Sequence, residues 1–216
     1  MNTKLVLDGK YRIQTIKTAG ISKDKLSEVA EQIKEMFLWF APGSTDEDIN
    51  RRLCQHPEAF VDILTHVESG ECRGFTVHYT EQFNGSWVMF RGGTIVRDRS
   101  RGLYKILLHH SISAEKQDFV VAMTQNPRVY EALRALSTRG VVYPAVGVSN
   151  PEEVKLIAQE FCKAPGLDSE SMIVPGVYGS IRKDKEFKSA KDHLVEKFFA
   201  ESLGDDAGFF VVVSLR

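Results

Sequence analysis

The segment from Thr94 to Lys105 constrains the fold more than any other part of this chain. It joins an apolar, strand-like stretch to a basic turn containing glycine, and an amphipathic helix pattern follows at once. The first N–H groups of a helix have no partner within the helix and carry partial positive charge. A turn that presents them beside Arg97, Arg99 and Arg101 therefore makes a site for phosphate. The alternative is a solvated basic loop in front of an ordinary helix.

A second element, about twenty residues further on, favours the phosphate site. Phe119 to Met123 has no polar alternation, which predicts a strand covered on both faces, as in a parallel arrangement. Asn126 and Pro127 then have the residue types of a helix N-cap and first helical position. Strand, helix and strand in this order imply a right-handed crossover.

The order strand, Arg-x-x-Gly turn, helix, strand, asparagine and helix resembles the GNAT superfamily of acyl-CoA-dependent acyltransferases. The stretch Arg99–Tyr104 resembles the pyrophosphate loop of that family, Gln/Arg-x-x-Gly-x-Gly/Ala. Asn126 resembles the asparagine that opens the family's next helix. The resemblance covers roughly residues 70 to 145. It implies an α/β, GNAT-like three-layer fold, in which a central mixed sheet with a β-α-β cofactor unit is flanked by helices. We expect a single acyltransferase domain over residues 1–216.

The resemblance implies acetyl-CoA or another acyl-CoA as cofactor. Backbone N–H groups from the turn and the helix start would bind the pyrophosphate, and Arg97 and Arg99 would add charge-assisted bonds. A strand N–H near Ile95 or Val96 would polarise the thioester carbonyl. The residues expected to bind cofactor are Ile95, Val96, Arg97, Arg99, Arg101, Gly102, Leu103, Tyr104, Lys105 and Asn126.

The catalytic half of the site departs from the family pattern. Tyr104 stands where the loop signature has Gly or Ala. Seven residues after the asparagine, many members carry a tyrosine that serves as general acid, and this chain has Leu133 at that position. Many members also carry a glutamate base on the strand before the loop, whereas residues 86–96 contain no acid. The candidates that remain for moving a proton are His78, Glu81 and Tyr130, and a path through ordered water is the alternative.

Two functions follow from this pattern. The first is an acyl-CoA-dependent N-acyltransferase, with acetyl as the expected group, in which a small-molecule or peptide amine attacks the thioester directly. The second is a non-catalytic acyl-CoA-binding sensor or scaffold of the same fold, which the missing strand acid and the missing tyrosine favour. We expect the enzyme, because many enzymes of this kind work through water and backbone groups.

Composition excludes several other classes. The 216 residues carry a net charge of −1, which argues against general nucleic-acid binding. No segment has the length of a membrane span and the N-terminus lacks the apolar core of a signal peptide, so we expect a cytoplasmic protein without membrane contact. We expect it to be a monomer or homodimer. Cys54, Cys72 and Cys162 have neither metal-ligand nor redox spacing, which predicts reduced, buried thiols and no metal site.

Periodicity and turn residues predict the remaining elements. Asn84-Gly85 predicts a hairpin turn, and Gly92-Gly93 permits a bulge, a close approach by a ligand, or a simple kink. The aromatic residues Phe37, Trp39 and Phe40 are expected in the core, with an acceptor pocket as the alternative. We expect strands over 11–16, 60–67, 75–80, 87–90, 119–123, 141–146 and 208–213, and helices over 22–40, 44–53, 102–114, 126–136, 151–161 and 189–203.

Overall fold

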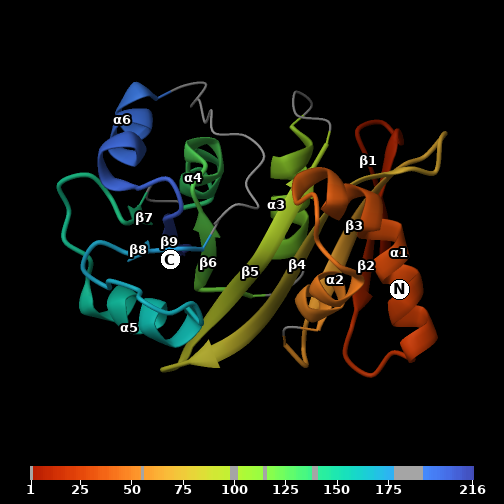
Figure 1. Ribbon diagram of the computed structural model, residues 1–216, viewed down its shortest axis with the longest axis horizontal. Coiled ribbons are helices and arrows are strands. Elements are labelled where there is room, and N and C mark those ends of the chain that lie inside the picture. The colour runs from red at the N-terminus through yellow and green to blue at the C-terminus, as the bar shows by residue number, and fades with distance from the viewer. Residues whose placement is uncertain (1, 55, 98–101, 114–115, 138–140, 178–191) are drawn as a thin grey trace. The chain divides into compact units, whose positions relative to one another are not determined.

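The computed structural model divides into two compact units, which are described separately (Figure 1). The first consists of Met1–Thr80 and Arg91–Lys116, and the second of Glu81–Phe90 and Gln117–Arg216. The expectation of a single domain stays a prediction. The residues that the structure describes are 2–54, 56–97, 102–113, 116–137, 141–177 and 192–216.

The first unit is built on strands in the spatial order β1-β2-β3-β4-β5. The pairs β1–β2, β2–β3 and β3–β4 are antiparallel. Its strands are β1 (Asn2–Val6), β2 (Tyr11–Lys17), β3 (Phe60–His66), β4 (Cys72–Phe83) and β5 (Ser86–Val96). Its helices are α1 (Lys23–Phe40), α2 (Asp46–Leu53) and α3 (Leu103–Ser113). The end of β4 and the first half of β5 belong to the second unit.

Side-chain alternation along the strands gives this sheet two apolar faces. On one face, Val61 and Ile63 of β3 join a core cluster with Val29, Ile33 and Leu53 of α1 and α2. On the other face, a second cluster lies under α3 and consists of Tyr11, Ile13, Leu64, Leu103 and Leu107. Because successive strand residues point to opposite faces, the adjacent residues Ile63 and Leu64 belong to different clusters. The helix α3 is therefore held against the sheet by its first residue, Leu103, which is 1% exposed.

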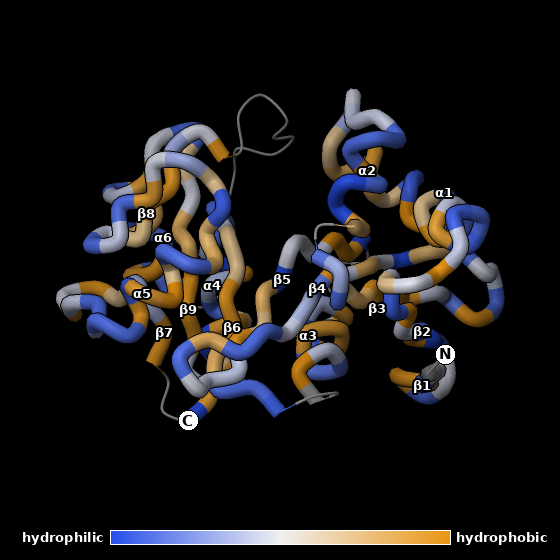
Figure 2. The backbone as a smooth tube through the Cα atoms, turned by 90° about the horizontal axis from the view of Figure 1, so that it is seen from below, coloured by the Kyte–Doolittle hydropathy of each residue, from blue (hydrophilic) through white to orange (hydrophobic). Residues whose placement is uncertain are grey.

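The second unit is organised around β9, which pairs antiparallel with β6, β7 and β8. Figure 2 shows β9 as a hydrophobic segment, and its residues Gly208 to Val213 are buried. The amide of Asp118 donates to Trp87 O over 2.8 Å, so β5 and β6 start side by side and run parallel. Its elements are β6 (Phe119–Thr124), α4 (Pro127–Arg134), β7 (Val142–Tyr143), α5 (Glu152–Phe161), β8 (Ile173–Val174), α6 (His193–Ser202) and β9 (Gly208–Ser214).

Parallel and antiparallel neighbours together make the sheet mixed, and helices accompany it in both units, so the predicted α/β class is confirmed. Two of the predicted helix starts are found as expected, whereas the predicted start at residue 189 lies outside the described residues. Ser22 caps α1, and Asn126 caps α4 with Pro127 at its first position. Thr45 and Asp48 form a capping box at the start of α2, which begins at Asp46, two residues after the predicted start at residue 44. The turn Asn84-Gly85 has φ of 48° and 81°, as the predicted hairpin requires.

Some details differ from the sequence expectations. The strand β1 was not predicted, and β7 is only two residues long. Cys54 is exposed, although all three cysteines are free as expected. Phe37 stacks on Phe75 in the core, whereas Phe40 is 46% exposed. None of the helices described here is both long and apolar enough to cross a membrane.

Candidate functional site

The end of β5 leads to α3, where the predicted phosphate site lies. The helix begins at Leu103, and its first hydrogen bond runs from Ile106 N to Gly102 O over 3.1 Å. Gly102 has φ of +70°, a conformation that residues with a Cβ rarely adopt, and open space surrounds the position a Cβ would take. Because Leu103 anchors the first turn in the core, the helix-start N–H groups are held in a fixed place.

The side chains of the predicted cofactor strand are committed to packing. Ile95 is 7% exposed and belongs to the core on the α1 side, while Val96 packs on the cluster beneath α3. A Cβ on Gly74 of β4 would lie 2.8 Å from Ile95 O, so the two backbones approach closely here. What this end of β5 can offer a ligand is therefore its backbone.

The predicted basic residues divide into described and undescribed ones. Arg99 and Arg101 lie outside the residues that the structure describes. Arg97 is exposed and its Nη1 donates to Glu35 Oε1 over 2.9 Å, a surface pair that solvent screens. Lys105 is exposed on the first turn of α3. Two described side chains next to the helix start, Arg97 and Lys105, therefore carry positive charge.

A buried cation lies close to the same helix turn. Arg91 of β5 is 4% exposed, and its Nη1 donates to the Tyr104 hydroxyl over 2.9 Å. Its Nη2 donates to Thr94 Oγ1, and its Cζ lies 5.3 Å from the centroid of the Tyr104 ring. Side chains three apart on a regular strand point to opposite faces, so the contact between Arg91 and Thr94 indicates a bulge at the intervening glycines.

His78 lies in a buried polar network rather than on a surface. Its Nε2 is 3.0 Å from Asp62 Oδ2, which also accepts from Ser111 Oγ over 2.6 Å. His78 is 3% exposed and Asp62 1%. Burial disfavours the charge of Asp62, but hydrogen bonds and charge from His78, with the hydroxyls of Ser111 and Thr15, outweigh it, and the pKa of Asp62 lies below its usual value.

The network extends to a second histidine, His110, which lies on α3. Thr15 Oγ1 donates to Asp62 Oδ1 over 2.6 Å and lies 2.9 Å from His110 Nε2. Because the single Thr15 proton is used on Asp62, His110 Nε2 is the donor to Thr15. Burial lowers the pKa of His110, which keeps its ring neutral. These contacts tie β2, β3 and β4 to the C-terminal part of α3.

The remaining predicted site residues lie in the second unit. The Asn126 side chain accepts from Arg128 N over 3.0 Å, so it caps α4 as expected. Tyr130, one turn into α4, donates its hydroxyl proton to Pro144 O over 2.6 Å, and burial raises its pKa to about 12. Leu133 is fully buried in the core. Glu81 is exposed on β4.

The structure thus groups the predicted residues by unit. In the first unit it brings together the end of β5, from Ile95 to Arg97, and the start of α3, from Gly102 to Lys105. In the second unit it places Asn126 and Tyr130 on one helix. Sequence reasoning missed Arg91 and Asp62. The signal available for both was a single charged residue inside an otherwise apolar strand.

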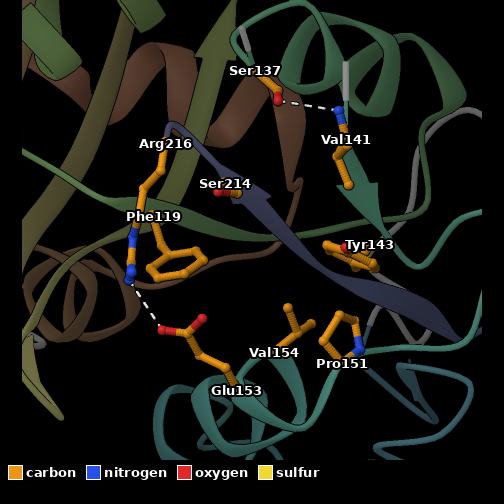
Figure 3. A pocket seen from close by; sticks show the side chains of 9 residues that line it. All are labelled: Phe119, Ser137, Val141, Tyr143, Pro151, Glu153, Val154, Ser214 and Arg216. Atoms are coloured by element: carbon orange, nitrogen blue, oxygen red, sulfur yellow. Dashed lines mark hydrogen bonds and ion pairs between the residues drawn. The ribbon is translucent and has the colours of Figure 1, made fainter. Parts of the chain in front are cut away.

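The second unit also contains a cavity of about 230 Å³ (Figure 3). Its charged lining residues pair with each other, since Arg216 Nη2 lies 3.0 Å from Glu153 Oε1. The Arg216 guanidinium also lies 4.5 Å from the centroid of the Phe119 ring. The other lining residues are Ser137, Val141, Tyr143, Pro151, Val154 and Ser214.

Within the described residues, no group of three His, Cys, Asp or Glu side chains is placed to hold a metal ion.

Comparison with known proteins gives matches among solved structures only. No protein-family model and no curated protein sequence matches the chain. A GNAT family acetyltransferase of Staphylococcus aureus is 16% identical, with 47% of this chain and 76% of that chain covered and a TM-score of 0.36. The ribosomal-protein-S5-alanine acetyltransferase of Vibrio fischeri is 14% identical, with 62% and 81% covered and a TM-score of 0.44.

A third solved structure is the NatC complex bound to Gag peptide and CoA, which is 15% identical, with 58% of this chain and 83% of that chain covered and a TM-score of 0.40. All three are acetyltransferases or contain CoA by their descriptions. The description of the Staphylococcus aureus structure names the family that the sequence of this chain resembles. At these identities and TM-scores, function is inferred from the chain's own residues.

Proposed function

We propose that this protein is an acyl-CoA-dependent N-acyltransferase that moves an acyl group, acetyl in the first instance, from CoA to an amine. The observation that carries the proposal is the start of α3 together with the end of β5. There, the helix start is fixed by buried Leu103, while exposed Arg97 and Lys105 lie on either side of the turn. Helix-start N–H groups with nearby cations suit the pyrophosphate of CoA.

The acyl group would lie along β5. Since the Ile95 and Val96 side chains are used in packing, the strand would act through its backbone. A strand N–H that donates to the thioester carbonyl stabilises the oxyanion of the tetrahedral intermediate, an effect typically worth about 3 kcal/mol of barrier. The amine attacks the carbonyl carbon, the C–S bond breaks, and CoA leaves as the thiolate, which takes up a proton.

The amine must be neutral before it attacks, so a proton has to leave it. Of the three candidates, His78 is engaged with Asp62, and Tyr130 is engaged with Pro144 O and has a pKa of about 12. Neither state suits a general base at neutral pH. We therefore propose that ordered water carries the proton away, with Glu81 as the exposed carboxylate among the three candidates.

One observation favours the second candidate function, binding of acyl-CoA without catalysis. Residues 86–96 contain no acid, and the two most buried catalytic candidates already have partners. A sensor or scaffold would need the phosphate site but no base.

Release of free thiol from acetyl-CoA separates the two functions. The assay is run with amines of three kinds: peptides with a free α-amine, aminoglycosides, and small polyamines. A longer acyl-CoA serves as a second donor. Amine-dependent thiol release that is lost in Gly102→Asp supports the enzyme. CoA binding without release for any donor and amine in the panel would favour the sensor.

A further inference from the structure

Arg91 is a buried cation whose contacts within the described residues are with uncharged groups. Its guanidinium makes two hydrogen bonds, to the hydroxyls of Tyr104 and Thr94, and both acceptors are uncharged. Its Nε is buried and has no hydrogen-bond partner among the described residues. In the part of the chain that the structure describes, no carboxylate forms an ion pair with Arg91. Burying a charge under these conditions is costly, because the lost hydration is not replaced by an opposite charge.

The contacts of Arg91 direct its charge toward the start of α3. Tyr104 is the second residue of that helix, and its ring and its hydroxyl both contact the guanidinium. The hydroxyl of Thr94 is in turn 2.7 Å from that of Thr76 on β4, so the group is fixed from the strand side as well. The buried positive charge of Arg91 thus contacts the side chain of the second residue of the helix whose first N–H groups would bind an anion.

We propose that Arg91 is the buried countercharge for a phosphoanion bound at the N-terminus of α3, and that it acts as a positioning residue through Tyr104. The inference rests on the proposed function, in which that anion is the pyrophosphate of CoA. Without the ligand, Arg91 destabilises the protein. With the ligand bound, the attraction acts through a low-dielectric interior and is screened less than a surface pair.

This account predicts effects of opposite sign on the free protein and on its complex. In Arg91→Gln, the amide can still donate to Tyr104 or Thr94, but the charge is gone. We expect the melting temperature of the free protein to stay constant or rise, since replacing a buried ion is often neutral or stabilising. We expect the Kd for CoA to increase at least about tenfold, which corresponds to ~1.4 kcal/mol. Arg91→Lys, which keeps the charge, should retain more affinity than Arg91→Gln.

The experiment is calorimetric titration of CoA and of inorganic pyrophosphate into the wild-type protein and both variants, together with melting curves of the free proteins. Weaker binding with unchanged or higher stability supports the inference. A lower melting temperature with unchanged Kd would show a purely structural Arg91 and overturn it. If Arg91→Gln fails to fold, Arg91→Met provides the second replacement, and failure of both would also overturn the inference.

The two probes separate this inference from the proposed function. If the wild type binds pyrophosphate but not CoA, and Arg91→Gln weakens that binding, the countercharge role stands and the acyltransferase proposal falls. If the wild type binds CoA and Arg91→Gln binds it equally well, the acyltransferase proposal stands and the countercharge role falls. Binding of neither probe would overturn both.

Discussion

The Nε2 atom of His78 lies 3.0 Å from Asp62 Oδ2, and both side chains are almost completely buried between the sheet and α3. Asp62 also accepts from the hydroxyls of Ser111 and Thr15. One carboxylate therefore joins three strands to the helix whose first turn forms the candidate phosphate site. Its loss should affect stability first and ligand binding only through the position of α3.

We predict that Asp62→Asn lowers the free energy of unfolding by about 3 kcal/mol, because removing one partner leaves the buried groups uncompensated. Since folding lowers the pKa of Asp62 from its ordinary value, its contribution is present above the pKa of the unfolded chain and is lost as the pH falls through the lower folded-state pKa. Urea unfolding from pH 7 to pH 2 should show a flatter acid limb in the variant. Glu28→Gln, which breaks the exposed pair with Lys25, is the control and should change stability by less than about 1 kcal/mol. Equal effects of the two substitutions would contradict this role.

Gly74 should be intolerant of a side chain. A Cβ at this position would lie 2.8 Å from Ile95 O, and a backbone atom cannot give way as a flexible side chain can. We expect Gly74→Ala to destabilise the protein by about 1–3 kcal/mol, the usual range for overpacking. Gly204→Ala, where the nearest atom is 4.0 Å away, is the matched control. Chemical denaturation measures both, and a neutral Gly74→Ala would show that β4 and β5 do not approach so closely.

The Asn126 side chain caps α4 by accepting a hydrogen bond from Arg128 N. Because alanine cannot accept this bond, Asn126→Ala should lower the stability by about 1 kcal/mol. Asn126→Asp keeps the acceptor and should melt close to the wild type. If the protein transfers acyl groups, the rate of Asn126→Ala should fall by more than the stability loss explains, since the family resemblance places this helix beside the pantetheine. Full stability together with full activity in Asn126→Ala would show that the position has neither role.

How far the sequence predicts this structure depends on how local the determining interactions are. The caps at Ser22 and Asn126 and the turn at Asn84-Gly85 involve residues only a few positions apart, so their types suffice. The strand β1 forms a local hairpin with β2, and it was missed because its five residues have little periodicity. The strand β7 is short for a different reason, since it is defined by its pairing with the distant β9 rather than by its own two residues.

The candidate site shows the same division. The helix start after Gly102 follows from the sequence, because glycine, arginines and an amphipathic pattern are consecutive. The partners of Arg91 and Asp62 do not, since Tyr104 and His78 lie 13 and 16 residues away and meet them only across the fold. His78 and Tyr130 were candidates by residue type, and only their burial and their hydrogen bonds reveal how they are engaged.

No single substitution among His78, Glu81 and Tyr130 should remove a dedicated general base. We expect each of His78→Gln, Glu81→Gln and Tyr130→Phe to lower the acyl-transfer rate by less than the 10²- to 10⁴-fold that such a base typically contributes. The rate should follow mainly the ionisation of the acceptor amine across pH. Rates measured from pH 6 to pH 10 (roughly the span between the pKa values of histidine and lysine), with circular dichroism as the check on folding, decide the matter. A loss beyond about a thousandfold in one folded variant would identify a dedicated catalyst.

The central claim is that the turn before α3 binds the phosphates of CoA, and Gly102 tests it most directly. Gly102→Asp places a carboxylate at the helix start, where open space surrounds the Cβ position, while Gly102→Asn adds a neutral side chain of nearly the same shape. Both share the strain of φ at +70°, so their difference isolates the charge. In calorimetric titration with CoA, we expect binding by the wild type, weaker binding by Gly102→Asn, and a further loss of about tenfold or more in Gly102→Asp, because its carboxylate repels the phosphates. Equal CoA affinity in the aspartate and asparagine variants would contradict the account.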